Sequence, residues 1–234
     1  MPEILRRKAP DSRAAEVARV WEGETAAVIA TGPSLNKDDL ERIRGLRCIA
    51  VSDSYLVAPW AEVLYAADHT WWKWHIEGRK KTWPWVSFTA DEVKQAMADF
   101  RGQKVTISHN QIIQDDSILV LDNAGPDGLS TKQDAICTGQ NSGYQALNIA
   151  VLAGARRILL LGFDMRFHGG KSHAHNGHDA PSLEQSYINY AKNFSKMENP
   201  LKDLGVEVIN CTPGSMIKAF PFSTVEQECV ISAV

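Results

Sequence analysis

Short apolar runs alternate with amphipathic segments along most of the chain. Five largely apolar runs end in small, polar or acidic residues, at 26–30, 47–51, 62–66, 158–161 and 206–209. Runs of this length are typical of strands buried on both faces of a parallel sheet. Apolar residues at helical spacing predict helices near 37, over 91–100, from 144 and over 183–204. The alternation predicts an α/β fold, with a Rossmann-like, doubly wound, mostly parallel sheet and helices on both faces.

Weaker patterns complete the chain. Two shorter strands are expected at 104–107 and 117–121, and Pro200 is expected to interrupt the last long helix. Apolar residues fall roughly on one side of a helix between 4 and 21, which predicts a peripheral N-terminal helix over residues 1–22. Residues 23–234 are then one domain, with a lid at about 164–182. The tail after Phe220 has little pattern, and an edge strand or a partner contact is open there.

The segment 138–164 predicts a polar turn, a helix, a tight turn and a buried strand. Asn141 and Ser142 are residue types favoured at helix N-caps, and Gly143 allows the backbone to approach a ligand closely. The strand ends at Gly162 and is followed by Asp164. Ligands of α/β sheets bind beyond the carboxyl ends of the strands, and helix N-termini attract phosphate. The segment therefore predicts an anion-binding helix start beside a strand-end carboxylate.

A glycine turn follows the first buried strand. It reads Thr31-Gly32-Pro33-Ser34, and Ser34 or Asn36 can cap the helix that comes next. Strand, glycine turn and helix form the usual first phosphate contact of a doubly wound fold. The turn matches neither the GxGxxG dinucleotide pattern nor the GxxxxGK[ST] phosphate loop, so neither is predicted.

Carboxylates follow three of the predicted strands, as Asp53, Asp68 and Asp164. Together they could hold Mg²⁺ against phosphate oxygens, or they could simply cap the strand ends. The HxH pair beyond Asp164 has no cysteines at zinc spacing, so no transition-metal site is predicted. The aromatic stretch Trp71, Trp72, Trp74, Trp83 and Trp85 favours core packing, and one or two rings lining a ligand pocket is the alternative.

The order of these motifs resembles a known family. Residues 30–35, ATGPSL, resemble the GNGPSL turn of bacterial sialyltransferases of glycosyltransferase family 42, and 142–164 is similar to their SG-helix-strand-GID segment. Gly177-His178, then a helix and a strand ending at 210–215, continue the match in order. The resemblance covers about 26–215. The 6-hydroxymethylpterin pyrophosphokinase-like proteins share the glycine turn and similar strand ends.

The resemblance implies a nucleotide site. In the sialyltransferases the glycine turn and the SG segment hold a cytidine nucleotide, a GH histidine is the proposed general base, and lid tyrosines help the phosphate to leave. Thr31 and Asp53 depart from that pattern, since the transferases carry asparagines there. The predicted catalytic residues are His178 and Asp164. Those predicted to bind the substrate are Thr31, Gly32, Pro33, Ser34, Asp53, Asp68, Asn141, Ser142, Gly143, Gly162, Tyr187 and Tyr190.

Three functions follow as hypotheses. The favoured one is nucleotide-dependent group transfer, most like sialyltransferase-type glycosyl transfer from a CMP-sugar-like donor to an unidentified acceptor. The alternatives are Mg-dependent pyrophosphate transfer from ATP to a pterin-like alcohol, and nucleotide binding without catalysis.

Composition and charge indicate which classes of partner are expected. The 234 residues carry a net charge of -3 without a basic tract, which argues against nucleic acid as the main partner. No apolar run has the length of a membrane helix, and the N-terminus lacks the apolar core of a signal peptide. The four cysteines have no pair spacing, which favours free thiols in a reducing cytoplasm. A homo-oligomer is left open.

Overall fold

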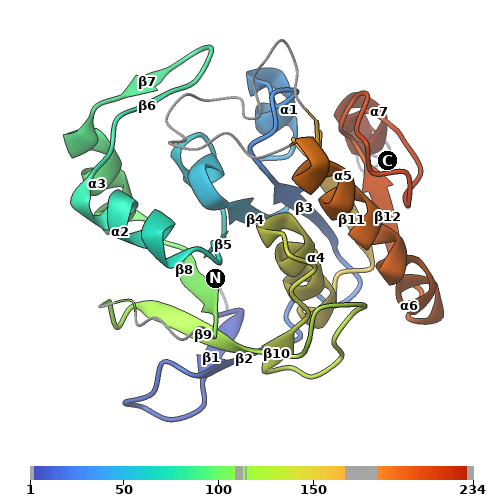
Figure 1. Ribbon diagram of the computed structural model, residues 1–234, viewed down its shortest axis with the longest axis horizontal. Coiled ribbons are helices and arrows are strands. Elements are labelled where there is room, and N and C mark those ends of the chain that lie inside the picture. The colour runs from blue at the N-terminus through green and yellow to red at the C-terminus, as the bar shows by residue number, and fades with distance from the viewer. Residues whose placement is uncertain (1–2, 109–112, 114, 167–183, 231–234) are drawn as a thin grey trace.

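The computed structural model describes residues 3–108, 113, 115–166 and 184–230. Its centre is an eight-stranded sheet in the order β10-β9-β8-β5-β4-β3-β11-β12, and every neighbouring pair is parallel (Figure 1). The strands are β3 (Thr25–Ile29), β4 (Arg47–Val51), β5 (Val63–Tyr65), β8 (Gln103–Ile107), β9 (Ile118–Asn123), β10 (Ala135–Ile136), β11 (Arg157–Leu161) and β12 (Glu207–Asn210). The predicted α/β class with a parallel sheet is confirmed.

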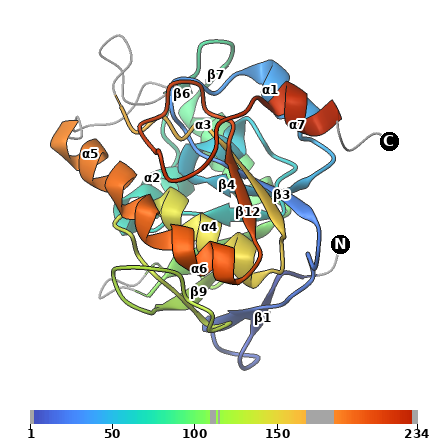
Figure 2. The ribbon, with the colours of Figure 1, turned by 90° about the vertical axis from the view of Figure 1, so that its right-hand side faces the viewer.

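Both faces of the sheet are buried under helices. Successive side chains of each apolar strand point to opposite faces and therefore belong to two different cores. Val28 of β3 belongs to one core, whereas Ile29 belongs to the other. On the first face lie α4 (Ser142–Leu152), α5 (Glu184–Asn193), η2 (Phe194–Met197) and α6 (Glu198–Asp203). On the second lie α1 (Lys37–Arg42), η1 (Ser52–Leu56), α2 (His69–Glu77), α3 (Ala90–Asp99) and α7 (Val225–Val230) (Figures 1 and 2).

The strand order reverses between β3 and β11. From β3 the chain adds strands outward in one direction, through β4, β5, β8, β9 and β10. It then returns to lay β11 against the other side of β3, in register from Thr25–Arg157 to Ile29–Leu161. Such a reversal leaves a crevice outside the carboxyl ends of the two strands, where doubly wound proteins bind their ligands.

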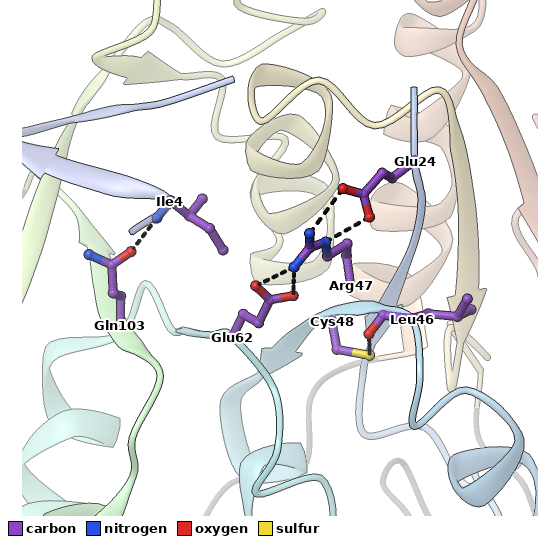
Figure 3. Close-up of polar contacts among 7 residues, drawn as sticks. All are labelled: Ile4, Glu24, Leu46, Arg47, Cys48, Glu62 and Gln103. Atoms are coloured by element: carbon purple, nitrogen blue, oxygen red, sulfur yellow. Dashed lines mark hydrogen bonds and ion pairs between the residues drawn. The ribbon is translucent and has the colours of Figure 1, made fainter. Parts of the chain in front are cut away.

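The predicted N-terminal helix is wrong. The segment forms an antiparallel pair, β1 (Leu5–Arg7) with β2 (Ala15–Val17), in which Ala15 and Val17 are buried and Glu16 is exposed. Val17 N–H donates to the carbonyl of Gln133 at 2.7 Å, and the Gln103 side-chain oxygen accepts from Ile4 N–H at 2.8 Å (Figure 3). These partners lie a hundred residues away, so local periodicity does not report them.

The C-terminal third agrees with the prediction in one place and departs from it in another. The expected interruption of the helix over 183–204 is present, at η2 (Phe194–Met197), one turn before Pro200, which itself lies in α6. Proline at 200 has no N–H and its ring crowds the carbonyl four residues earlier, so the break precedes it. The tail makes one isolated bridge, between Phe222 and Asn210, and then forms α7 rather than an edge strand.

No helix in the described ranges has both the length and the apolar character needed to cross a bilayer.

Candidate functional site

A cavity of about 300 Å³ opens at the carboxyl ends of β3, β4 and β11, at the reversal of strand order. We call it the central hollow. Nine residues that the sequence predicts to bind the substrate line it: Thr31, Gly32, Asp68, Asn141, Ser142, Gly143, Gly162, Tyr187 and Tyr190. The remaining lining is Ala30, Val51, Ser52, Trp71, Gln140 and Met165. The volume is at the lower end of the range for small-molecule sites.

The glycine turn after β3 and the end of β11 interlock at the floor of the hollow. Gly32 N–H donates to the carbonyl of Gly162 at 2.8 Å, and Ala30 N–H donates to the carbonyl of Leu161 at 2.8 Å. A Cβ placed on Gly32 would overlap both Oδ2 of Asp164 and the Gly162 carbonyl. Gly162 itself has a φ of 71°, which a side chain rarely allows. Glycine is therefore required at 32 and 162 by the closeness of the two turns.

Asp164 holds the glycine turn from behind the hollow. Its Oδ2 accepts a 2.7 Å hydrogen bond from the Ser34 hydroxyl, and its Oδ1 accepts from the Ser34 backbone N–H at 3.2 Å. Burial raises the pKa of this carboxyl, while the Ser34 hydrogen bonds and the charge of Arg166 oppose the rise. Asp164, Pro33 and Ser34 do not belong to the lining of the hollow. The geometry explains Asp164 as a turn-holding group, and its predicted catalytic role stays a prediction.

The start of α4 forms one wall. Asn141 is the N-cap, as predicted, and its Oδ1 accepts from Gly143 N–H at 2.8 Å and from Tyr144 N–H at 3.2 Å. A Cβ on Gly143 would stand 2.6 Å from the Phe163 ring, so this glycine is needed for packing against Phe163. The positive end of the α4 dipole meets the hollow at Asn141 and Ser142.

A second helix also begins at the hollow. Asp68 is the N-cap of α2, where its Oδ1 accepts from Thr70 N–H at 2.7 Å. The sequence predicts that Asp68 either binds a ligand or acts as a capping group after its strand. Its carboxylate does cap a helix, and it also borders the cavity. From the opposite side α5 contributes Tyr187 and Tyr190, whose rings meet edge to face with centroids 6.1 Å apart.

Asp53, predicted among the residues that bind the substrate, does not line the hollow. Ser52 has a φ of 52° and begins η1, so Ser52 borders the cavity while Asp53 is directed into the core on the α2 face. Oδ2 of Asp53 lies 2.8 Å from Lys81 Nζ, and Oδ1 accepts from Trp71 Nε1 at 2.7 Å. These buried donors occupy the carboxylate that a ligand or a metal would need.

Backbone strain is concentrated on the hollow. In the described part of the chain, the non-glycine residues with positive φ are Ser52 at 52°, Gln140 at 58° and Met165 at 50°. All three line the cavity. Such conformations cost free energy and persist where the surrounding structure imposes them, commonly at ligand sites. No sequence pattern indicated Ser52, Gln140 or Met165.

The predicted set of three aspartates is not brought together. Within the described ranges no group of three His, Cys, Asp or Glu side chains is placed to hold a metal ion. In the described part of the chain, Asp53, Asp68 and Asp164 therefore do not form the shared magnesium site suggested as one interpretation. His178, the predicted base, and most of the expected lid lie outside the described residues.

Comparison with known proteins adds one structural similarity. No protein-family model matches the chain, and no curated protein sequence matches it. Among solved structures, the chain is similar to the sialyltransferase CstII from Campylobacter jejuni, determined in complex with a substrate analogue, cytidine-5'-monophosphate. The two are 12% identical over 86% of this chain and 85% of that chain, with a TM-score of 0.47.

Proposed function

We propose that the protein binds a nucleotide in the central hollow and transfers a group from a nucleotide-activated donor, as a sialyltransferase-type glycosyltransferase does. One observation carries the proposal. The two segments that resemble family 42 motifs, the turn at Thr31–Gly32 and the helix start at Asn141–Gly143, are 110 residues apart and border the same cavity. A shared hollow is what a nucleotide held by both motifs requires.

The chemistry of the lining favours an anionic ligand. Helices α2 and α4 both begin at the hollow, with their N-caps Asp68 and Asn141 in its wall. The two helix starts direct their positive dipole ends toward a phosphate in the hollow. In the glycine turn the N–H groups of Gly32 and Ser34 already donate to Gly162 and Asp164, so the turn contributes a close approach of its backbone. Since Asn141 Oδ1 already accepts from two of the α4 amides, a phosphate would replace this oxygen or bind beside it at Ser142.

The proposed reaction is glycosyl transfer with inversion. The bond between the sugar carbon and the donor phosphate oxygen breaks, and its electron pair leaves with the nucleotide. The acceptor oxygen forms the new bond to the sugar carbon and yields its proton to His178, the residue matched to the family's base. Tyr187 and Tyr190 line the hollow and supply hydroxyl donors for the leaving phosphate.

The pyrophosphokinase alternative has less support. It needs carboxylates that bind magnesium, and Asp53 is engaged by Lys81 and Trp71 instead. Nucleotide binding without catalysis remains the competing proposal, because it requires the same hollow.

A binding and turnover experiment separates these possibilities. Calorimetric titration with CMP, UMP, AMP and ATP, with magnesium or with EDTA, identifies the nucleotide and any metal requirement. Incubation with CMP-sugars and candidate acceptors then measures transfer and hydrolysis in the wild type and in His178→Ala, with His168→Ala as the matched control from the same stretch of sequence. Metal-independent turnover lost only in His178→Ala supports glycosyl transfer. Tight nucleotide binding without turnover supports the non-catalytic alternative, and an absence of nucleotide binding overturns the proposal.

A further inference from the structure

A charged cluster is buried directly behind the central hollow. The exposed fractions of Asp53, Lys81 and His75 are 1%, 2% and 0%. Lys81 Nζ lies 2.8 Å from Oδ2 of Asp53, and His75 Nε2 lies 2.6 Å from Oδ1. These residues come from η1, α2 and β6 (Lys81–Thr82), which pairs with β7 (Ser87–Phe88). The carboxylate is thus a junction between three elements of the α2 face.

Trp71 connects this cluster to the cavity. Its indole N–H donates to Oδ1 of Asp53 at 2.7 Å, and the ring stacks on the His75 imidazole with centroids 4.0 Å apart and an interplanar angle of 22°. Trp72 meets it edge to face at 5.0 Å. Trp71 itself is among the residues that line the hollow. The Tyr55 ring also meets it edge to face, with centroids 6.1 Å apart. Contacts therefore fix the indole at its nitrogen, on one face and at its edges, and the 5% of Trp71 that stays exposed borders the cavity.

Stability alone is a poor explanation for the cluster. Removing an aspartate and a lysine from water is costly, and apolar residues of similar volume commonly serve a core as well or better. What the carboxylate adds is direction, because a hydrogen bond from Trp71 Nε1 sets the orientation of the indole plane. Of the four side chains in the cluster, Trp71 borders the hollow and the other three do not. The cluster therefore acts on the site through Trp71.

We propose that Asp53 is a positioning residue, which together with Lys81 and His75 holds the Trp71 indole as an aromatic wall against which the planar base of a bound nucleotide packs. The inference rests on the proposed function for the identity of the ligand. It adds the part of the site that recognises the base, whereas the helix starts and the glycine turn face the phosphate. An indole held rigidly contributes more to binding than a mobile one, because less conformational entropy is lost when the ligand arrives.

The decisive measurement compares ligands with and without a base. Calorimetry gives the Kd of the wild type for CMP, UMP and AMP, and for ribose 5-phosphate, which has the phosphate and sugar alone. Trp71→Leu and Trp71→Phe are expected to raise the Kd for the tightest-binding nucleotide by about 5- to 150-fold, the range for loss of a base–aromatic contact. The Kd for ribose 5-phosphate is expected to change by less than about twofold, because the phosphate contacts remain.

Trp74→Phe is the matched control. Trp74 also lies on α2 and is half-buried beneath the Arg79 guanidinium, which lies 4.0 Å from the Trp74 ring centroid, and it does not line the hollow. Its substitution removes a tryptophan from the same helix and is expected to leave both affinities unchanged.

Asp53 is tested by loss and by partial rescue. Asp53→Leu is expected to weaken nucleotide binding as Trp71→Phe does, and Asp53→Asn, whose side-chain oxygen still accepts from Trp71, is expected to restore part of the affinity. Each variant is compared at a temperature where circular dichroism shows it folded. If both Asp53 variants unfold, Trp71→Leu and Trp71→Phe decide whether the indole contacts the base. Nucleotide affinity unchanged in Trp71→Leu and Trp71→Phe, in a wild type that binds nucleotide, overturns this inference alone. A wild type that binds none of the three nucleotides overturns the proposed function with it.

Discussion

The Ser34 hydroxyl donates a 2.7 Å hydrogen bond to the buried carboxylate of Asp164, a residue 130 positions later in the chain. The Ser34 backbone N–H donates to the same group at 3.2 Å. Because Ser34 follows β3 and Asp164 follows β11, this contact ties together the two turns on either side of the reversal in strand order. The floor of the central hollow depends on it.

Ser34→Ala should destabilise the protein. The substitution leaves Asp164 with fewer donors in a buried position, and the free energy of unfolding is expected to fall by about 1–3 kcal/mol. Urea denaturation measures the change. Ser117→Ala is the control, since Ser117 donates to Asp115 at 2.6 Å in an exposed position and should cost less than about 0.5 kcal/mol. Equal losses in the two variants would show that burial of Asp164 adds nothing.

Asp164→Asn should change the pH dependence of stability. Burial raises the pKa of Asp164, so the folded chain binds this proton more tightly than the unfolded chain does. The contribution of Asp164 to the free energy of unfolding is then full below its unfolded pKa of about 3.9. It is lost as the pH rises through the raised pKa of the folded state. Asparagine does not titrate. The variant should therefore gain stability relative to the wild type between about pH 3.5 and pH 7.

Urea denaturation of the wild type and Asp164→Asn across this pH range measures the difference in their free energies of unfolding. The contributions of the other titrating groups are the same in both proteins and cancel. A wild type that instead gains stability over the variant as the pH rises would mean that Ser34 and Arg166 favour the carboxylate more than burial disfavours it.

Gly32→Ala should disrupt the hollow. The new methyl group would overlap Asp164 and the Gly162 carbonyl, so the turns must separate. Crowding of this kind destabilises a protein by about 1–3 kcal/mol, and loss of CMP binding is expected at temperatures where the variant is still folded. Gly45→Ala is the control, because a Cβ there meets nothing within 4 Å. CMP affinity retained in Gly32→Ala would place the phosphate away from this turn.

Arg47→Met should reduce stability without affecting the site. Arg47 begins β4 and joins Glu24 at 2.8 Å and Glu62 at 3.2 Å, at the end of the sheet away from the hollow (Figure 3). Since Glu62 is only 8% exposed, removing its cation should cost about 1–3 kcal/mol. Glu24→Gln, in an exposed pair, should cost less than about 1 kcal/mol. Thermal denaturation measures the stability of each variant, and CMP titration measures its affinity. A lower CMP affinity in folded Arg47→Met would contradict the prediction that Arg47 stabilises the sheet without affecting the hollow.

The sequence predicted most of the sheet and both motif turns. The range expected for β4 agrees with Arg47–Val51, and Asn36 and Asn141 cap α1 and α4 as their residue types suggested. These features depend on neighbouring residues, through burial on both faces of a strand or a side-chain oxygen near free amides. Nine of the residues predicted to bind the substrate do meet at one cavity for the same reason, since the carboxyl ends of parallel strands share an edge.

The succession of strands, caps and turns therefore follows from the amino-acid sequence, because each arises from contacts within a few residues. Contacts between elements far apart in the chain set which side chains line the central hollow. The positive φ of Ser52 sends Asp53 into the core, where Lys81 and Trp71 meet it, and neither partner is close in the chain. Partners distant in the chain also explain why residues 4–17 form a pair of strands. Some of their backbone donors and acceptors bond to Gln103, Val120 and Gln133. No local pattern specifies partners so far away.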